Sequence, residues 1–124
     1  MDLLVTGLNI LLALGTIGLG LFGWLRPETT MEYIGTTPTD DTGLAKSEIR
    51  AASGAVWVGA GVGAILLATP IAYLMLAALW VGASVGRGTS VFVDGANTGK
   101  PLIFFIVELV FAVLLLAINL PAVL

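Results

Sequence analysis

The sequence predicts an all-α integral membrane protein, a four-helix bundle with a tight central hairpin and a short interfacial helix. Its composition is the first reason, because 58% of the 124 residues are hydrophobic and only 10% are charged. A soluble domain carries about 25% charged residues, so this chain lacks the polar surface that a globule in water needs. The second reason is that the apolar residues form long runs between two polar loops. The length predicts a single transmembrane domain over residues 1–124.

The first predicted span covers residues 3–25. It is long enough for a hydrocarbon core of about 30 Å at a rise of about 1.5 Å per residue. A cleaved signal peptide is the alternative, and it would need a basic start and a small-residue cleavage site. The chain instead opens Met1-Asp2, and its apolar run ends at Leu25 before Arg26. We therefore expect a retained span.

The polar stretch 26–49 follows the first span. Pro27 suits the first turn of a short helix at the membrane interface, and Gly35 suits its end. Residues 36–42 then predict a loop. Candidate N-caps of the following helix are Asp40, Asp41 and Thr42.

Residues 51–86 form one nearly continuous apolar run. A straight helix of that length would extend roughly 54 Å, nearly double the hydrocarbon thickness. The dipeptide Thr69-Pro70 lies in the middle, and a residue before proline disfavours helix. We therefore predict two spans, 51–68 and 71–86, joined as a hairpin. A single kinked helix is the alternative, and it would place apolar residues in water.

The fourth span is predicted at 102–120, after a polar loop over residues 87–100. Pro101 opens this run and Pro121 closes it. Two glycine patterns resemble nucleotide-binding motifs. The pattern at 18–23 lies inside a span and follows no strand, and the one at 95–100 has a short spacer and no Ser or Thr after its lysine. We interpret both as chance matches.

Basic residues predict the orientation of the spans. All five flank the two polar loops: Arg26, Lys46, Arg50, Arg87 and Lys100. Short loops rich in Lys and Arg favour the cytoplasmic side. We therefore expect a multi-pass protein of the cell inner membrane with cytoplasmic polar loops and both termini on the opposite side.

Small residues recur every fourth position on the second and third spans. Helices in lipid associate through small residues that let their backbones approach closely, so these stripes predict helix packing. The glycines of the stripes are Gly59, Gly63, Gly82 and Gly86.

Composition also excludes several kinds of chemistry. The chain contains no Cys and no His, which removes thiol nucleophiles, disulfides, and thiolate or imidazole metal ligands. We expect no metal site and no cofactor. A net charge of −3 with five scattered basic residues gives no attraction for nucleic acid.

One acidic residue, Glu108, lies inside the fourth apolar run. It follows Pro101 by seven residues, roughly 10 Å below the loop-side surface at about 1.5 Å per residue. A lone carboxylate at that depth is costly and needs a partner. Arg50 and Arg87 can reach it from the second and third spans, and Asp94 lies near the same level. The cluster predicts either a structural ion pair, or a site for a proton, an anion, or a polar lipid or quinone headgroup.

The same residues carry a family resemblance. The segments are Ser47-Glu-Ile-Arg-Ala-Ala-Ser-Gly54, Gly86-Arg-Gly-Thr-Ser90, Val93-Asp-Gly95 and Val107-Glu-Leu109. Together they resemble a bacterial four-span membrane family known only as a domain of unknown function, the 4345 family. The resemblance implies four spans and a recurring charged set, carried here by Arg50, Arg87, Asp94 and Glu108. It implies no reaction, substrate or cofactor. Two departures are Ser53-Gly54 where paired glycines look usual and a longer loop after Gly95.

Two function classes follow. The first is a non-catalytic accessory or assembly subunit of a larger membrane complex, favoured by small size, glycine-rich faces and the absence of catalytic side-chain types. The second is a small transporter or ligand-binding protein that uses the charged cluster. We do not expect an enzyme. Expected partners are membrane lipids and either other membrane subunits or a homo-oligomer, and not nucleic acid.

Overall fold

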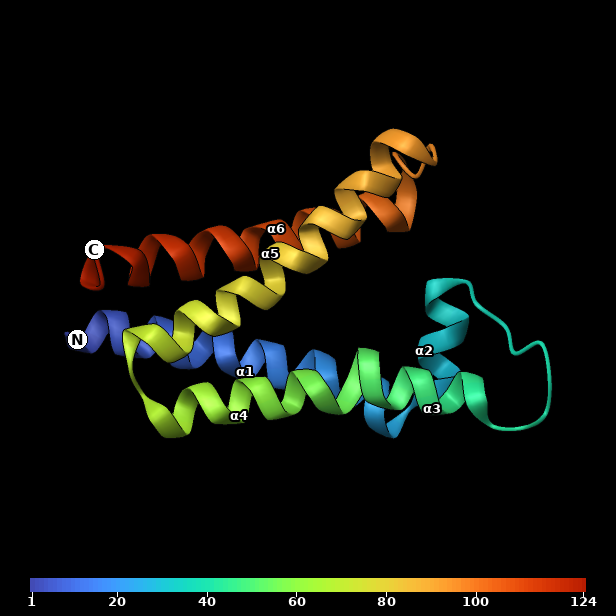
Figure 1. Cartoon of the computed structure of the whole chain (residues 1–124), viewed down its shortest axis with the longest axis horizontal. Coiled ribbons are helices and arrows are strands. Elements are labelled where there is room, and N and C mark those ends of the chain that lie inside the picture. Colours follow the sequence, from blue (N-terminus) through green and yellow to red (C-terminus); the bar gives the residue numbers. More distant parts are fainter. The chain divides into compact units, whose positions relative to one another are not determined.

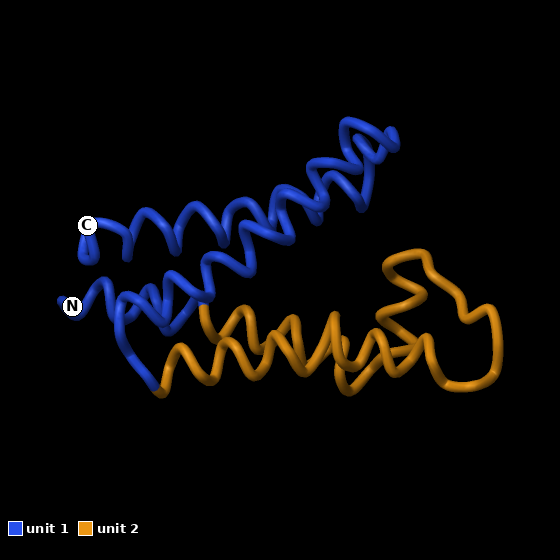
Figure 2. Tube along the Cα trace, in the orientation of Figure 1, with its two compact units in different colours: residues 1–12, 67–124 blue, residues 13–66 orange.

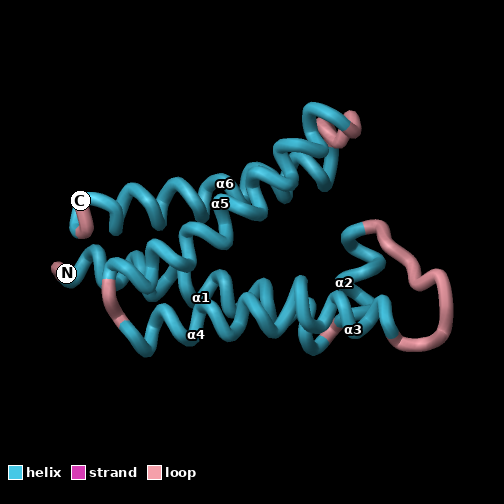
Figure 3. Tube along the Cα trace, in the orientation of Figure 1, coloured by secondary structure: helices cyan, strands magenta, loops and turns pink.

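The computed structural model describes all 124 residues and contains helices, turns and loops but no strand (Figures 1 and 3). Four helical stretches are long and apolar enough to cross a membrane, so the chain is an all-helical, multi-pass membrane protein. The elements are α1 (Leu3–Leu25), α2 (Pro27–Ile34), α3 (Leu44–Arg50), a π-helical turn (Ala51–Ala55), α4 (Val56–Leu67), α5 (Pro70–Val93), α6 (Gly99–Asn119) and a final 3₁₀ turn (Leu120–Ala122).

The chain divides into two compact units (Figure 2). Unit 1 combines residues 1–12 with residues 67–124, and unit 2 comprises residues 13–66. Helix α1 contributes its first half to unit 1 and its second half to unit 2. The single transmembrane domain predicted over residues 1–124 stays a prediction.

Helices α5 and α6 form an antiparallel pair in unit 1. The rings of Trp80 and Phe111 have their centroids 4.6 Å apart. About two turns further along α5, Arg87 lies over the ring of Phe104, with 5.0 Å between the guanidinium carbon and the ring centroid. Trp80 thus pairs with Phe111 and Arg87 with Phe104, so a later residue of α5 meets an earlier residue of α6, as antiparallel packing requires. Gly95, with a φ of 70°, helps the chain reverse between the two helices.

Two asparagines join the first helix to the last within unit 1. The side-chain amides of Asn9 and Asn119 exchange two hydrogen bonds of 2.8 Å, and both residues are fully buried. Asn119 also donates to the carbonyl of Leu115 at 2.9 Å. Each buried amide is thereby satisfied by the other, which is what an apolar environment demands. The pair holds the first half of α1 against the end of α6.

Replacing Asn119 by leucine should lower the free energy of unfolding by about 1–2 kcal/mol, because the buried amide of Asn9 loses its partner. Denaturant-dependent unfolding in mixed micelles measures the loss. The matched control is Asn9→Leu/Asn119→Leu, which removes both amides and should recover part of the stability. A single variant as stable as the parent would show that the amide pair contributes nothing.

Close backbone contact between α1 and the second span organises unit 2. A Cβ built on Gly20 would lie 2.7 Å from the carbonyl oxygen of Gly54, and one on Gly61 would lie 2.9 Å from the carbonyl oxygen of Ala13. Gly23 likewise faces Ser53 with no room for a side chain. Glycine is therefore what allows these helices to approach. The π-helical turn coincides with this contact.

The short helix predicted after the first span is confirmed as α2. Pro27 occupies its first position, and Gly35 ends it in a left-handed conformation with a φ of 77°. The N–H of Thr36 donates to the carbonyl of Met31 at 2.9 Å, which closes the last turn. Met31 is buried, so one face of α2 packs on protein.

The break predicted at Thr69-Pro70 is also confirmed, and it excludes one continuous helix. Helix α4 ends at Leu67, and α5 begins at Pro70. Thr69 is extended, with φ −117° and ψ 151°, and its side chain accepts a hydrogen bond of 3.2 Å from the N–H of Ala72. Ala68 takes a left-handed φ of 50°, so the backbone leaves the helical path directly after α4.

Three helical stretches extend beyond the predicted spans to which they correspond. The second helical stretch begins at Leu44, before the expected 51, the third runs to Val93, past the expected 86, and the fourth begins at Gly99. Long cationic side chains such as those of Arg50 and Arg87 can remain in a helix while their charged heads reach polar partners. The N-cap position of α3 is Gly43 and not one of the three predicted residues, but the hydroxyl of Thr42 accepts a hydrogen bond of 3.3 Å from the N–H of Leu44, the first residue of α3.

The glycines predicted to carry packing are not those that meet another helix within the units. A Cβ at any of the four predicted positions would meet nothing within 4 Å: Gly59, Gly63, Gly82 and Gly86. The close contacts in unit 2 fall instead on Gly20, Gly23, Gly54 and Gly61. A four-residue repeat marks a smooth face but does not say which face meets a neighbour.

Candidate functional site

Helix α6 presents Glu108 on its buried face. Ala112, Leu115 and Asn119 follow it at intervals of four, three and four residues, and each is at most 2% exposed. Residues at this spacing share one face of a helix. The carboxylate is therefore carried to the inside of unit 1, and its side chain is only 13% exposed.

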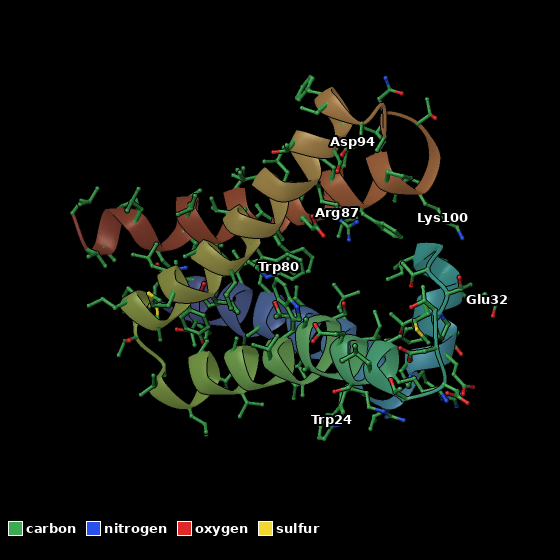
Figure 4. All side chains as sticks on the ribbon, turned by 45° about the vertical axis from the view of Figure 1, so that its right-hand side comes forward. Trp24, Glu32, Trp80, Arg87, Asp94 and Lys100 are labelled. Carbon is green, nitrogen blue, oxygen red and sulfur yellow. The ribbon has the colours of Figure 1, made fainter.

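Helix α5 presents Arg87 in the same way. The residues before it at helical spacing are Tyr73, Ala77, Trp80 and Ser84, and all four are buried. Arg87 continues that stripe one turn further, and Figure 4 shows Trp80, Arg87 and Asp94 following one another along α5. The packing of the apolar positions thus decides where the arginine points.

Arg87 and Glu108 form the ion pair of unit 1. The distance between Arg87 Nε and Glu108 Oε1 is 3.0 Å, and this contact is also a hydrogen bond. The guanidinium lies over the ring of Phe104, which adds a cation–π contact. Phe104 precedes Glu108 by one helical turn, so one face of α6 supplies both contacts. A carboxylate among apolar side chains is thereby neutralised by a neighbouring helix.

One oxygen of the pair has no partner. Glu108 Oε2 is buried and makes no hydrogen bond in the structure. A buried acceptor without a donor costs about 1–3 kcal/mol, and more when it is charged. The site therefore holds an open acceptor position beside a satisfied one. A proton, or a hydroxyl or amide donor, is the chemistry that would satisfy it.

The other two members of the predicted cluster make different contacts. Asp94 accepts a hydrogen bond of 2.8 Å from the hydroxyl of Ser90 at the end of α5. Arg50 belongs to unit 2, where its Nη1 donates to the carbonyl oxygen of Trp24 at 2.6 Å. Of the two arginines that the sequence offered as partners of Glu108, the structure pairs Arg87 with it.

Sequence reasoning missed two components of this unit. Phe104 was not selected, although its position four residues before Glu108 places it on the same helical face. Asn9, inside the first apolar run, was not selected either. Its partner Asn119 lies three helical turns after Glu108, so it shares the buried face of α6. Nothing local in the sequence pairs two residues that lie at opposite ends of the chain.

Comparison with known proteins adds one match. No curated protein and no solved structure matches the chain. The sequence profile of a family described as a domain of unknown function, DUF4345, matches residues 4–119. That match extends from the start of α1 to the end of α6 and includes the residues of the ion pair. The chain therefore belongs to the DUF4345 family.

Proposed function

We propose that this protein is a non-catalytic accessory or assembly subunit of a larger complex in the cell inner membrane. The observation that carries the proposal is the open space beside the glycines of the second and third spans, such as Gly82 and Gly86. Glycine inside a helix costs about 0.8–1.0 kcal/mol relative to alanine. Close approach of a helix from another chain would offset that cost, because small residues are what association in lipid uses.

The side-chain inventory supports the same proposal. The chain has no Cys and no His, the residues that most often serve as nucleophile and general base. The charged pair Arg87–Glu108 is held by its own unit through an ion pair and a ring contact. By contrast, no atom of their own unit lies within 4 Å of a Cβ built on the stripe glycines, so these helix faces are free to meet another chain.

Purification in a mild detergent tests the assembly role. We expect a tagged chain to co-elute with another membrane protein at a fixed stoichiometry. The variant Gly82→Leu/Gly86→Leu should abolish this co-elution, because it fills the smooth face of α5. Val81→Leu is the matched control, since Val81 is exposed and, one residue before Gly82 and five before Gly86, points away from their stripe. Elution of the parent chain alone, or only with copies of itself, would overturn the proposal.

A second candidate function is favoured by the unpartnered Glu108 Oε2. We propose as the alternative a small transporter or a protein that binds a lipid-type or quinone-type headgroup, with Glu108 accepting a proton or a donor group. Proton flux into liposomes, followed with a trapped pH-sensitive dye, tests the transport version. Glu108→Gln should abolish the flux, and Asp94→Asn should retain it. Flux no higher than in empty liposomes, or equal in Glu108→Gln and the parent, would remove this candidate.

We also propose that the polar loops are cytoplasmic and that both termini lie on the opposite side, as the basic residues favour. The chain has no cysteine of its own, so any labelling of a single-cysteine variant comes from the introduced residue. A membrane-impermeant maleimide should label Asp2→Cys in intact cells. It should label Thr98→Cys, in the loop between α5 and α6, only after permeabilisation. Labelling of Thr98→Cys in intact cells, with Asp2→Cys labelled only after permeabilisation, would show the opposite orientation and contradict the proposal.

A further inference from the structure

Unit 2 contains an open pocket of about 450 Å³ where α1 ends and α3 passes into the π-helical turn. Its walls come from both stretches. The residues that matter are Trp24, Lys46, Ser47, Arg50, Ala51 and Ala55. The pocket is polar and basic on the α3 side, and apolar at Trp24 and along the π-helical turn.

The sequence explains why the basic residues gather there. Lys46, Ser47 and Arg50 are spaced by one and three positions, so they share one face of α3. Arg50 directly precedes the apolar run, and Trp24 lies at the end of the first span. Tryptophan and basic residues are enriched where hydrocarbon meets water. The pocket therefore lies at the depth of the lipid headgroups.

The guanidinium of Arg50 is oriented and still has donors to offer. Its Nη1 donates to the carbonyl oxygen of Trp24 at 2.6 Å, and this is its one hydrogen bond in the protein. Arginine carries five N–H donors in a planar fork that suits phosphate oxygens. The hydroxyl of Ser47 makes no hydrogen bond in the protein, and the side chains of Arg50 and Ser47 are both exposed.

Lys46 is the second cation of the pocket. Its ammonium group forms an ion pair with Glu28, and the two side chains are 44% and 73% exposed. The hydrogen bond from Lys46 lowers the pKa of Glu28 below its ordinary value, so this carboxylate is ionised at neutral pH. An exposed ion pair contributes little to stability, because water and salt screen the attraction. Lys46 can therefore share its donors with an incoming anion, while Arg50, which forms no ion pair and acts on Glu28 only at longer range, adds a second positive charge.

We propose that this pocket binds the phosphate of an anionic phospholipid headgroup. Arg50 and Lys46 supply the charge, and Ser47 donates a further hydrogen bond. The acyl chains lie along the small residues Ala51 and Ala55. A lipid fits better than free phosphate because an apolar wall continues from the basic face into the span, where acyl chains are already present. Basic pockets at the cytoplasmic ends of spans bind such headgroups by this chemistry.

Native mass spectrometry of the full chain tests the site, with the protein released from mixed micelles of phosphatidylglycerol and phosphatidylcholine. We expect a retained phosphatidylglycerol adduct in preference to phosphatidylcholine. Arg50→Gln should reduce that adduct about tenfold, because a charge-assisted hydrogen bond is lost. Arg26→Gln is the matched control, since it removes the same charge from the same unit but lies outside the pocket lining.

A second variant distinguishes loss of lipid binding from loss of the folded structure. Ala51→Leu keeps every charge but fills the pocket, so it should also lose the adduct while its helical circular dichroism matches that of the parent. Equal retention in the parent, Arg50→Gln and Ala51→Leu would overturn the proposal. Complete displacement of the lipid by millimolar inorganic phosphate would assign the site to free phosphate and overturn the lipid assignment.

Discussion

Replacing Arg87 by alanine should lower the free energy of unfolding by about 2–3 kcal/mol, since it leaves the Glu108 carboxylate uncompensated among apolar side chains. Breaking a fully buried pair costs about 3–5 kcal/mol, and we expect less because the Arg87 side chain is 42% exposed. The substitution also removes the guanidinium from the ring of Phe104. Unfolding in mixed micelles, followed by circular dichroism, measures the change.

The matched control for Arg87→Ala removes both charges. In Arg87→Gln/Glu108→Gln no charge is left buried, so stability should return to within about 1 kcal/mol of the parent. Glu108→Gln alone should cost little, because Arg87 can turn its charge toward the polar interface. If Arg87→Ala unfolds at the same denaturant concentration as the parent, the pair has no energetic role.

Replacing Gly54 by alanine is the second change with a large expected effect. A Cβ at Gly54 would lie 2.7 Å from the Cα of Trp24 and 2.8 Å from the carbonyl carbon of Gly23. Both are backbone atoms, so α1 and the π-helical turn must move apart. We expect a loss of about 2–3 kcal/mol, at the upper end of the usual cost of overpacking. The same unfolding measurement applies.

Gly59→Ala is the matched control, one turn and a half further along the same stretch. No atom lies within 4 Å of the position of its Cβ, and alanine favours helix over glycine by about 0.8–1.0 kcal/mol. The control should therefore be neutral or slightly stabilising. If both substitutions destabilise equally, close packing at Gly54 is not what holds α1 to the second span.

The composition, together with the prolines and glycines that begin and end helices, was enough to predict the helical architecture. The first span matches α1 at both ends. Proline and glycine also located α2 and the break before α5, because these residues act through local backbone geometry that a neighbouring helix does not override. The sequence features that act within one or two turns were therefore read correctly.

Features that depend on a partner element were harder to predict. Arg87 suggested the end of a span, yet α5 continues to Val93 because Glu108 of the next helix satisfies the arginine. The repeats containing Gly59 and Gly82 predicted packing faces, while the close backbone contact inside unit 2 uses Gly20 and Gly54. Spacing defines a face of a helix, but the contacts of that face depend on how distant segments meet.

In the candidate site, too, a local feature could be predicted from the sequence, and the contacts between helices could not. Glu108 was identified from one carboxylate in an apolar run, since such a group needs a partner wherever the helices go. The choice between Arg50 and Arg87 required the structure, and so did the unpartnered Oε2. The pocket at Arg50 could not be predicted from the sequence, because it forms only where α3 lies beside the end of α1.

Exchanging the two charges tests the central claim most directly, namely that Arg87 neutralises the carboxylate that α6 carries into the unit. Arg87→Glu and Glu108→Arg should each destabilise the protein strongly, since each places two like charges side by side. Combining them as Arg87→Glu/Glu108→Arg should restore most of the stability in the unfolding measurement. If the combined variant is no more stable than the worse of the two single variants, the two side chains do not pair.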